Sequence, residues 1–325
     1  MDELQDTRNI PHVLIFPFPV QGHVTPMLRL AETLSFSNLK ITFLNSHHNH
    51  HRLLRHSDVF SRFSSHPNFH FESISDGLPD DKHRSVDRAM LTACGTVMAP
   101  LFKELLTKLV SQRDSPVTCV IADGLMDFAV DITQEIGVKL VYFRIPSAAF
   151  FWVCWCIPQL IQSREFPFED ENMDQEITSI PGMENFLRRR DLPTFCRVYD
   201  LKEDLSFEAI SLATQQTSRA HALILNTFDD LEGPTVARIG SHCVKVYTIG
   251  PLDAHLKHKR SLLAPKTATS NSLWEEDRGC LTWLDEKPLK SVIYVSFGSI
   301  TVLTKAQLLE FWHGLVNSGR PFLWN

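Results

Sequence analysis

The sequence lacks several features that define whole classes of protein. No stretch offers the roughly 18 uninterrupted apolar residues of a membrane-spanning helix, and the start, MDELQDTRN, is polar, so we expect neither a membrane span nor a signal peptide. The 32 lysines and arginines are scattered and the net charge is −6, which argues against nucleic acid as a partner. Seven cysteines, an odd number, do not suit a secreted disulfide framework. These absences favour a cytoplasmic protein with reduced thiols.

Two common catalytic turns are also missing. No G-x-G-x-x-G follows the first predicted strand, which makes a nicotinamide oxidoreductase a remote alternative. Ser147 is not part of a G-x-S-x-G turn, so we do not expect a hydrolase nucleophile there. The chain has instead 325 residues of 43% hydrophobic content, which exceeds the usual size of one core and predicts two domains.

The segment over residues 12–34 is predicted to form a strand, a turn and a helix. It starts with an apolar, β-prone run that ends at a proline, which predicts a buried parallel strand. We expect Thr25 to cap the following helix and Pro26 to take its first position. Gly22 and His23 then lie between the carboxyl end of a strand and the amino end of a helix, where open α/β sheets bind ligands.

A histidine at this position suits general-base catalysis. The positive end of the helix disfavours an imidazolium, so we expect the His23 ring to be neutral and able to accept a proton. Asp123 follows a buried strand predicted at Val117–Ala122, and from the same sheet edge it could orient that ring. Two alternatives stay open: His23 as a loop residue without chemistry, and Asp123 as the cap of the next helix, for which Asp127 is the better candidate.

The rest of the chain alternates strands with helices, which predicts a doubly wound parallel sheet. One long amphipathic segment, residues 85–112, is expected to break into two helices at Gly95 and Pro100. The further predicted strands are Lys40–Asn45, Phe69–Ile74, Leu140–Phe143, Ala222–Asn226 and Val244–Ile249.

Four histidines, at positions 47, 48, 50 and 51, follow the second strand in what we expect to be a loop. Imidazoles three or four residues apart can share a metal ion. Because no cysteine lies among them and acidic residues are few nearby, we expect no metal site. These histidines could instead line the mouth of a substrate pocket.

An aromatic segment follows the strand at Leu140–Phe143. Its residues Phe150, Phe151 and Trp152 start beside the sheet edge that carries His23. A stripe of this kind is more often part of a core, but these side chains could form the wall of an apolar acceptor pocket.

The composition changes after residue 251 and predicts a domain boundary. Residues 253–273 are basic and then rich in Ser, Thr, Pro and Ala with little periodicity, which indicates a linker. We therefore expect an N-terminal domain over residues 1–252 and the start of a second domain over residues 274–325.

The second domain is predicted to start with a helix whose apolar face is Cys280, Leu281, Trp283 and Leu284, followed by a strand at Val292–Ser296 and a turn. The turn contains Gly298 and Ser299, which can offer amides and a hydroxyl to a phosphate. Thr304 and Gln307 form a capping box, which predicts a helix through Val316.

Six motifs occur in order along the chain: FPFPVQGHVTPMLRLAETL, ADG at 122–124, LRRRDLPTFC, LILNTFDDLE, YTIGPL and CLTWLDEKPLKSVIYVSFGS. Together they resemble the plant family-1 UDP-sugar glycosyltransferases, and the resemblance covers essentially all of the chain. It implies a GT-B fold. An N-terminal, Rossmann-like, doubly wound parallel sheet would bind the acceptor, and a second Rossmann-like domain would hold the UDP-sugar.

The resemblance also implies a mechanism. His23 resembles the base that deprotonates the acceptor hydroxyl, and Asp123 resembles its charge-stabilising partner, in a single displacement with inversion at the anomeric carbon. Gly22, Ser147 and Ser299 are the implied donor-binding residues. UDP-glucose is the implied cosubstrate, and no metal is implied. The chain is most similar in character to enzymes that glucosylate a hydroxyl or carboxyl of terpenoids and iridoids; its oligomeric state is left open.

Two departures from the family pattern stand out. Ile145 occupies the place where many relatives have a threonine that contacts the sugar. The family's donor signature is not found before Asn325, so by resemblance only Ser299 and its turn remain of the diphosphate site. We therefore expect an incomplete chain with little or no transfer activity, and we keep a non-catalytic acceptor-binding or interaction protein as the alternative.

Overall fold

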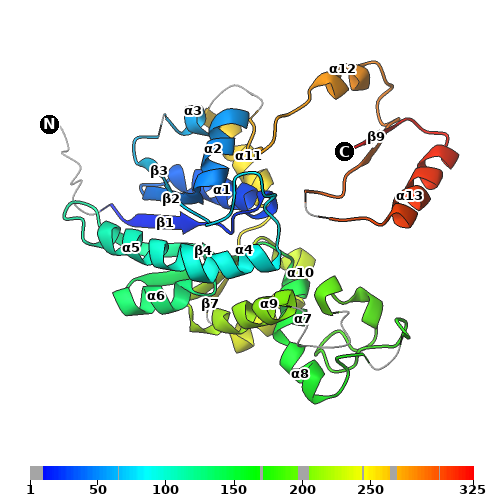
Figure 1. The fold of residues 1–325 in the computed structure, drawn as a ribbon, viewed down its shortest axis with the longest axis horizontal. Coiled ribbons are helices and arrows are strands. Elements are labelled where there is room, and N and C mark those ends of the chain that lie inside the picture. Colours follow the sequence, from blue (N-terminus) through cyan, green and yellow to red (C-terminus); the bar gives the residue numbers. More distant parts are fainter. Residues whose placement is uncertain are drawn as a thin grey trace.

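The structure, a computed structural model, describes residues 10–64, 66–168, 171–196, 205–243, 245–263, 269–299 and 301–325. Its largest element is a seven-stranded sheet with the order β3-β2-β1-β4-β5-β6-β7, in which all neighbouring strands are parallel (Figure 1). This is the order of a doubly wound, Rossmann-like sheet, so the predicted fold class is confirmed. The strands are β1 (His12–Phe16), β2 (Lys40–Ser46), β3 (Phe69–Ile74), β4 (Val117–Asp123), β5 (Lys139–Arg144), β6 (Ala222–Leu225) and β7 (Lys245–Thr248).

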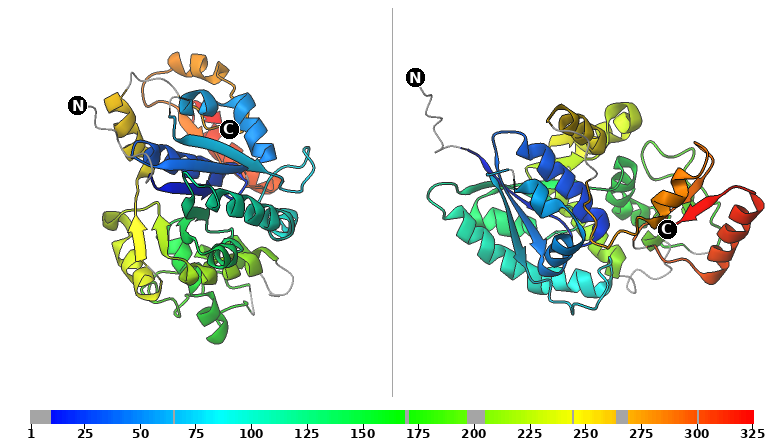
Figure 2. Two further views of the ribbon diagram at one scale, coloured as in Figure 1. Left: turned by 90° about the vertical axis from the view of Figure 1, so that its left-hand side faces the viewer. Right: turned by 90° about the horizontal axis from the view of Figure 1, so that it is seen from above.

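Helices cover both faces of this sheet, as the views in Figures 1 and 2 show. One face carries α1 (Gln21–Ser35), α2 (His47–His56), α3 (Val59–Phe63) and α11 (Leu252–Leu263). The other carries α4 (Arg88–Ala93), α5 (Ala99–Val110), α6 (Ala129–Ile136), α7 (Ala148–Trp155), α8 (Ile157–Gln162), α9 (Leu205–Gln216) and α10 (Asp229–His242).

Strand β1 shows how the sequence produces these two layers. Leu14 and Phe16 belong to the hydrophobic cluster on one face, and Val13 and Ile15 to the cluster on the other, because successive side chains of a strand point to opposite sides. All four are at most 8% exposed. Since both faces are covered, the strand appears in the sequence as a continuous apolar run.

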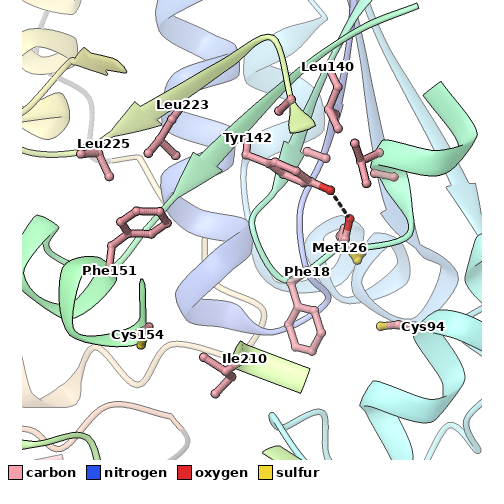
Figure 3. Close-up of a cluster of buried hydrophobic side chains, with 14 of the residues drawn as sticks. Phe18, Cys94, Met126, Leu140, Tyr142, Phe151, Cys154, Ile210, Leu223 and Leu225 are labelled. Atoms are coloured by element: carbon pink, nitrogen blue, oxygen red, sulfur yellow. Dashed lines mark hydrogen bonds between the residues drawn. The ribbon is translucent and has the colours of Figure 1, made fainter. Parts of the chain in front are cut away.

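The core also holds the turn that follows β4. The hydroxyl of Tyr142, a fully buried residue of β5, donates to the carbonyl oxygens of Met126 at 3.1 Å and Asp127 at 3.2 Å (Figure 3). Burial raises the pKa of the Tyr142 hydroxyl, so it stays a donor. This contact fixes the turn that starts at Asp123.

The helix after β1 begins earlier than the sequence predicts. Its N-cap is Val20 and not Thr25, and Pro26 lies inside the helix. The N–H of His23 donates to the carbonyl of Val20 at 2.9 Å, which closes the first turn ahead of the proline. Gly22 and His23 therefore belong to the first turn of α1 itself.

The helical segment within residues 85–112 does not break as predicted. A π-helical turn at Cys94–Met98 joins α4 to α5 without interruption, and Pro100 is accommodated in the first turn of α5. By length and composition alone, the run Arg88–Val110 could cross a membrane. Its apolar face, which includes Phe102, packs in the sheet core, as the core helix of a globular domain does. The absence of a membrane span stays a prediction.

The expected linker at 253–273 contains regular structure that its weak periodicity did not predict. Most of its first half is helix α11, which packs on α1. Arg260 Nε and Nη2 donate to the two carboxylate oxygens of Glu32, each at 2.5 Å, and Leu256 is 1% exposed. The predicted division of the chain into domains is not tested by these contacts.

A smaller unit follows, with α12 (Gly279–Asp285), β8 (Ile293–Val295), α13 (Lys305–Asn317) and β9 (Phe322–Trp324). β8 and β9 pair in parallel as a separate two-stranded sheet, beside the large sheet in Figures 1 and 2. The predicted capping box is confirmed: Thr304 Oγ1 accepts from the N–H of Gln307 at 3.2 Å, and the Gln307 side chain accepts from the N–H of Thr304 at 3.0 Å.

Candidate active site

His23 and Asp123 meet at the carboxyl edge of the large sheet. Their strands β1 and β4 are neighbours at the point where the strand order reverses, which is where open α/β sheets bind ligands. Nδ1 of His23 lies 2.7 Å from Oδ2 of Asp123. The side chains are 14% and 3% exposed, so only the histidine is open to solvent. The structure brings together the two residues that the sequence placed at this edge.

The contact defines which nitrogen of His23 is available. A carboxylate only accepts hydrogen bonds, so Nδ1 donates, and the lone pair of the neutral ring lies on Nε2. Nε2 has no hydrogen-bond partner in the described part of the chain. The ring of Phe18 lies 5.5 Å from the imidazole, centroid to centroid. Chemically, this arrangement could serve as an oriented general base.

Asp123 does not cap the next helix, which was the alternative left open, because the N-cap of α6 is Phe128 and has no side-chain cap. Asp123 Oδ1 accepts from the N–H of Leu125 at 2.9 Å, while its Oδ2 holds His23. Asp127 accepts from the N–H of Phe128 at 2.9 Å, at the start of α6. The carboxylate that bonds His23 is therefore itself fixed by the turn after β4.

Arg144 is a neighbour of this pair to which the sequence assigned no role. It ends β5, is 5% exposed, and donates to Thr214 Oγ1 at 2.8 Å. Its side chain crosses Gly124, where a Cβ atom would lie 2.2 Å from Arg144 Cδ, so a larger residue after Asp123 would force the arginine side chain to move. Burial lowers the pKa of Arg144, and the charge of Asp123 opposes that change. The sequence held one signal for Arg144: it lies at the carboxyl end of β5, and β5 is the neighbour of the strand that carries Asp123.

Ser147 and Ile145 have structural contacts. Ser147 Oγ accepts from the N–H of Phe150 at 3.1 Å and so caps α7. Ile145 packs against the hydrophobic cluster on the α1 side of the sheet. Gly22 has open space at its Cβ position. Donor binding by Gly22, Ser147 and Ser299 stays a prediction.

The predicted aromatic wall is wrong for two of its three residues. Phe151 and Trp152 are each 2% exposed in the core, and Trp152 Nε1 donates to the carbonyl of Pro181 at 3.0 Å (Figure 3 shows Phe151). Only Phe150 is partly exposed, with its ring 6.0 Å from that of Phe195. Helix α7 is apolar on every side, so its sequence gave no periodicity to separate buried from exposed residues.

A polar cavity of about 140 Å³ lies beside the first turn of α1. The four histidines after β2 belong to α2 and not to a loop, and His48 is one of the cavity residues. In the described part of the chain, no group of three His, Cys, Asp or Glu residues is arranged to hold a metal. The remaining lining comes from Gln21, Asn49, Arg52, residues 80–84, Leu273, Trp274 and Ser299.

Comparison with solved structures defines the class of fold. Os79 from O. sativa, solved in complex with UDP, matches with a TM-score of 0.74 and 25% identity over 96% of this chain and 67% of that chain. Medicago truncatula UGT71G1 complexed with UDP-glucose matches with a TM-score of 0.76 and 23% identity over 97% of this chain and 66% of that chain. The fold of the chain is thus that of the GT-B glycosyltransferases.

Sequence comparison identifies the family. No protein-family profile matches the chain. It is 52% identical over 326 residues to 7-deoxyloganetic acid glucosyltransferase of Catharanthus roseus, and 40% identical over 328 residues to (R)-mandelonitrile beta-glucosyltransferase of Prunus dulcis. Each match covers 98% of this chain and 67% of the relative, so the chain spans about two thirds of their length. The chain belongs to the plant UDP-glucosyltransferases, as the motifs predicted.

Proposed function

We propose that the chain carries the acceptor-activating part of a glucosyltransferase. This enzyme moves glucose from UDP-glucose to a hydroxyl or carboxyl of a small plant metabolite, with an iridoid or related terpenoid favoured. The observation that carries the proposal is the contact of His23 with Asp123 at 2.7 Å at the switch point of the sheet. The choice of an iridoid rests on the name of the Catharanthus roseus relative.

His23 acts as general base for a hydroxyl acceptor. The acceptor O–H gives its proton to Nε2 while its oxygen forms a bond to the anomeric carbon of glucose. The bond from that carbon to the UDP oxygen breaks on the opposite side, UDP leaves with the electron pair, and the configuration inverts. Asp123 stabilises the imidazolium that forms, because its carboxylate already bonds Nδ1.

A second candidate function is acceptor binding without transfer. Two contacts on the donor side favour it. Ser147 Oγ is already engaged as the cap of α7, and Ile145 packs in an apolar cluster and has no side-chain donor for a sugar hydroxyl. In this case the histidine would orient an acceptor hydroxyl and no glucose would move.

Transfer of radiolabelled glucose from UDP-glucose to a panel of monoterpenoid acids, alcohols and flavonols separates the two candidates. The chain is assayed alone and extended at its C-terminus with the part of the Catharanthus roseus relative that it does not match. We expect His23→Ala to lower kcat about 10²- to 10⁴-fold in whichever form is active. His258→Ala, an exposed histidine on α11, is the matched control and should leave kcat unchanged.

Each outcome decides between the candidates. Product from either form that depends on His23 supports the transferase. Equal rates for His23→Ala and the parent would exclude His23 as the base. No product from any form, together with saturable binding of an acceptor, would support acceptor binding without transfer.

A further inference from the structure

The polar cavity beside α1 contains a buried amide without a partner. Asn49 lies in the first turn of α2, is 1% exposed and lines the cavity. Neither Oδ1 nor Nδ2 has a hydrogen-bond partner among the residues that the structure describes. A buried polar group left unpaired costs about 1–3 kcal/mol. A ligand that supplies the missing hydrogen bonds therefore gains free energy at this place.

Arg52 stands on the same face of α2 and presents a cation to the same cavity. Its Nε donates to the carbonyl of Leu273 at 2.7 Å, and its guanidinium lies 3.8 Å from the centre of the Trp274 ring. These contacts fix the side chain and leave its terminal nitrogens without a hydrogen bond to a described residue. Within the described ranges, no carboxylate forms an ion pair with Arg52. Burial and the charges of Arg55 and Arg84 lower its pKa.

The charges around the cavity oppose one another at His48, and the positive charges have the larger effects on its pKa. Burial lowers the pKa of His48, and the positive charges of Arg84 and Arg52 lower it further, more strongly than Asp76 and Asp80 raise it. Arg84 is already neutralised, because its Nε and Nη2 donate to the Asp76 carboxylate, each at 3.0 Å. Among the described residues, Arg52 is thus the lining arginine without an ion pair; Asp80, Asp81 and Lys82, which pairs with Asp87, also line the cavity.

We propose that Asn49 and Arg52 form a subsite for an anionic oxygen group. The terminal N–H groups of Arg52 and the amide N–H of Asn49 donate to the anion, and Asn49 Oδ1 accepts from a hydroxyl of the same ligand. The proposal rests on the proposed function, because Gln21, two residues before His23, lines the same cavity. A volume of about 140 Å³ holds one carboxylate or phosphate group and not a whole sugar nucleotide.

Two sources supply this chemistry. A carboxylate of an acidic acceptor would enter beside Gln21, and a phosphate of the UDP-sugar would enter beside Ser299, which also lines the cavity. If the acceptor carboxylate fills the subsite, a hydroxyl of that acceptor is the nucleophile. The product is then an alkali-stable glucoside with a free acid and not a glucose ester.

The test measures binding directly and needs no turnover. Isothermal titration of the full chain with UDP, with 7-deoxyloganetic acid and with the methyl ester of that acid gives a Kd for each probe. Arg52→Gln removes the charge, and Asn49→Leu removes the amide at similar volume. Arg55→Gln is the matched control, because Arg55 is an exposed arginine on the same helix and does not line the cavity.

We expect both test variants to weaken anion binding at least tenfold and the control to bind as the parent does. If the test variants lose binding of 7-deoxyloganetic acid, and its methyl ester binds weakly to the parent and to every variant, the subsite is assigned to the acceptor. Loss for UDP alone assigns it to the donor. Asn49→Leu should also raise the melting temperature of the free chain, since it removes the unpaired amide.

The subsite is overturned if the parent binds none of the probes, or if Arg52→Gln binds every probe as the parent does. Arg52→Gln decides alone if Asn49→Leu does not fold. The readout is separate from that of the proposed function. If Arg52→Gln weakens binding but no glucose is transferred, the transferase is overturned and the subsite is kept. If glucose transfer depends on His23 but Arg52→Gln binds the probes as the parent does, the subsite is overturned and the transferase is kept.

Discussion

Helices α1 and α13 are similar in length, and each follows a strand, but they differ in what they bury. Of its 15 residues, α1 buries six; of its 13 residues, α13 buries only Leu315. Leu308, Phe311 and Trp312 of α13 are 45%, 46% and 49% exposed. Both helices have the local signals of a helix, including a complete capping box on α13. The comparison teaches that local signals decide where a helix lies, while tertiary packing decides how stable it is.

The strands show the same difference. Every residue of β1 is buried, whereas β8 and β9 have no buried residue and Tyr294 is 65% exposed. His23 and Asp123 follow strands that are fixed by a covered, seven-stranded sheet. Ser299 follows a strand of a two-stranded sheet, which is marginal by itself. In the described residues, the His23–Asp123 pair is therefore preorganised, and the turn expected to contact the diphosphate is not.

The largest expected effect compares two leucines. Leu28 of α1 is fully buried, so Leu28→Ala should lower the free energy of unfolding by about 2–5 kcal/mol. Leu308 of α13 is 45% exposed, and Leu308→Ala should lower it by less than about 1 kcal/mol. Urea unfolding followed by circular dichroism measures both. Equal losses would mean that the apolar face of α13 is covered in solution, which would remove the contrast between the two helices.

A second prediction compares two ion pairs. Arg260 of α11 bonds the buried carboxylate of Glu32 with two nitrogens, so Arg260→Met should cost about 1.5–3 kcal/mol, as a charged hydrogen bond does. Arg278 pairs with Glu276 at 3.3 Å, but the side chains are 66% and 39% exposed, and Arg278→Met should change stability by about 0.5 kcal/mol or less. The same urea titration measures both. If the two variants lose the same free energy, α11 is not held to α1 by this pair.

The strands were predictable because their signals are local. A buried parallel strand is an apolar run bounded by proline, glycine or polar residues, and the bounds predicted for Phe69–Ile74 are those observed. Helix α10 was not predicted, since Gly233 and Pro234 interrupt its pattern, and the structure accepts them with a kink at Glu232. Helix α11 was missed because its docking depends on Glu32, more than 200 positions away in sequence.

The pairing of His23 with Asp123 was predictable for a geometric reason: the carboxyl ends of adjacent parallel strands meet at one edge. The roles of Arg144 and Asn49 were not, because they follow from which side chains pack together between distant segments. Asn49 becomes a candidate only once both its amide atoms are seen buried without partners. Sequence thus predicts which backbone positions converge, and the structure is needed to find which polar groups are left unsatisfied there.

The smallest expected effect compares two helix caps. Ser147 caps α7 in the core, so Ser147→Ala should lower the free energy of global unfolding by about 1 kcal/mol. Thr304→Ala removes a similar cap from the exposed helix α13 and should only speed hydrogen exchange within that helix, because local opening there does not require the sheet to unfold.

Ser147→Asn separates capping by Ser147 from its predicted contact with the donor sugar. Asparagine caps a helix as well as serine does, so this variant should keep the stability of the parent. If its Kd for UDP-glucose also stays that of the parent, Ser147 acts through α7 alone, and a weaker Kd at unchanged stability supports the donor contact. A local cap contributes to global stability only when its helix unfolds with the rest of the protein. If Thr304→Ala lowers the midpoint of global unfolding as much as Ser147→Ala does, α13 therefore unfolds in the same cooperative unit as the large sheet.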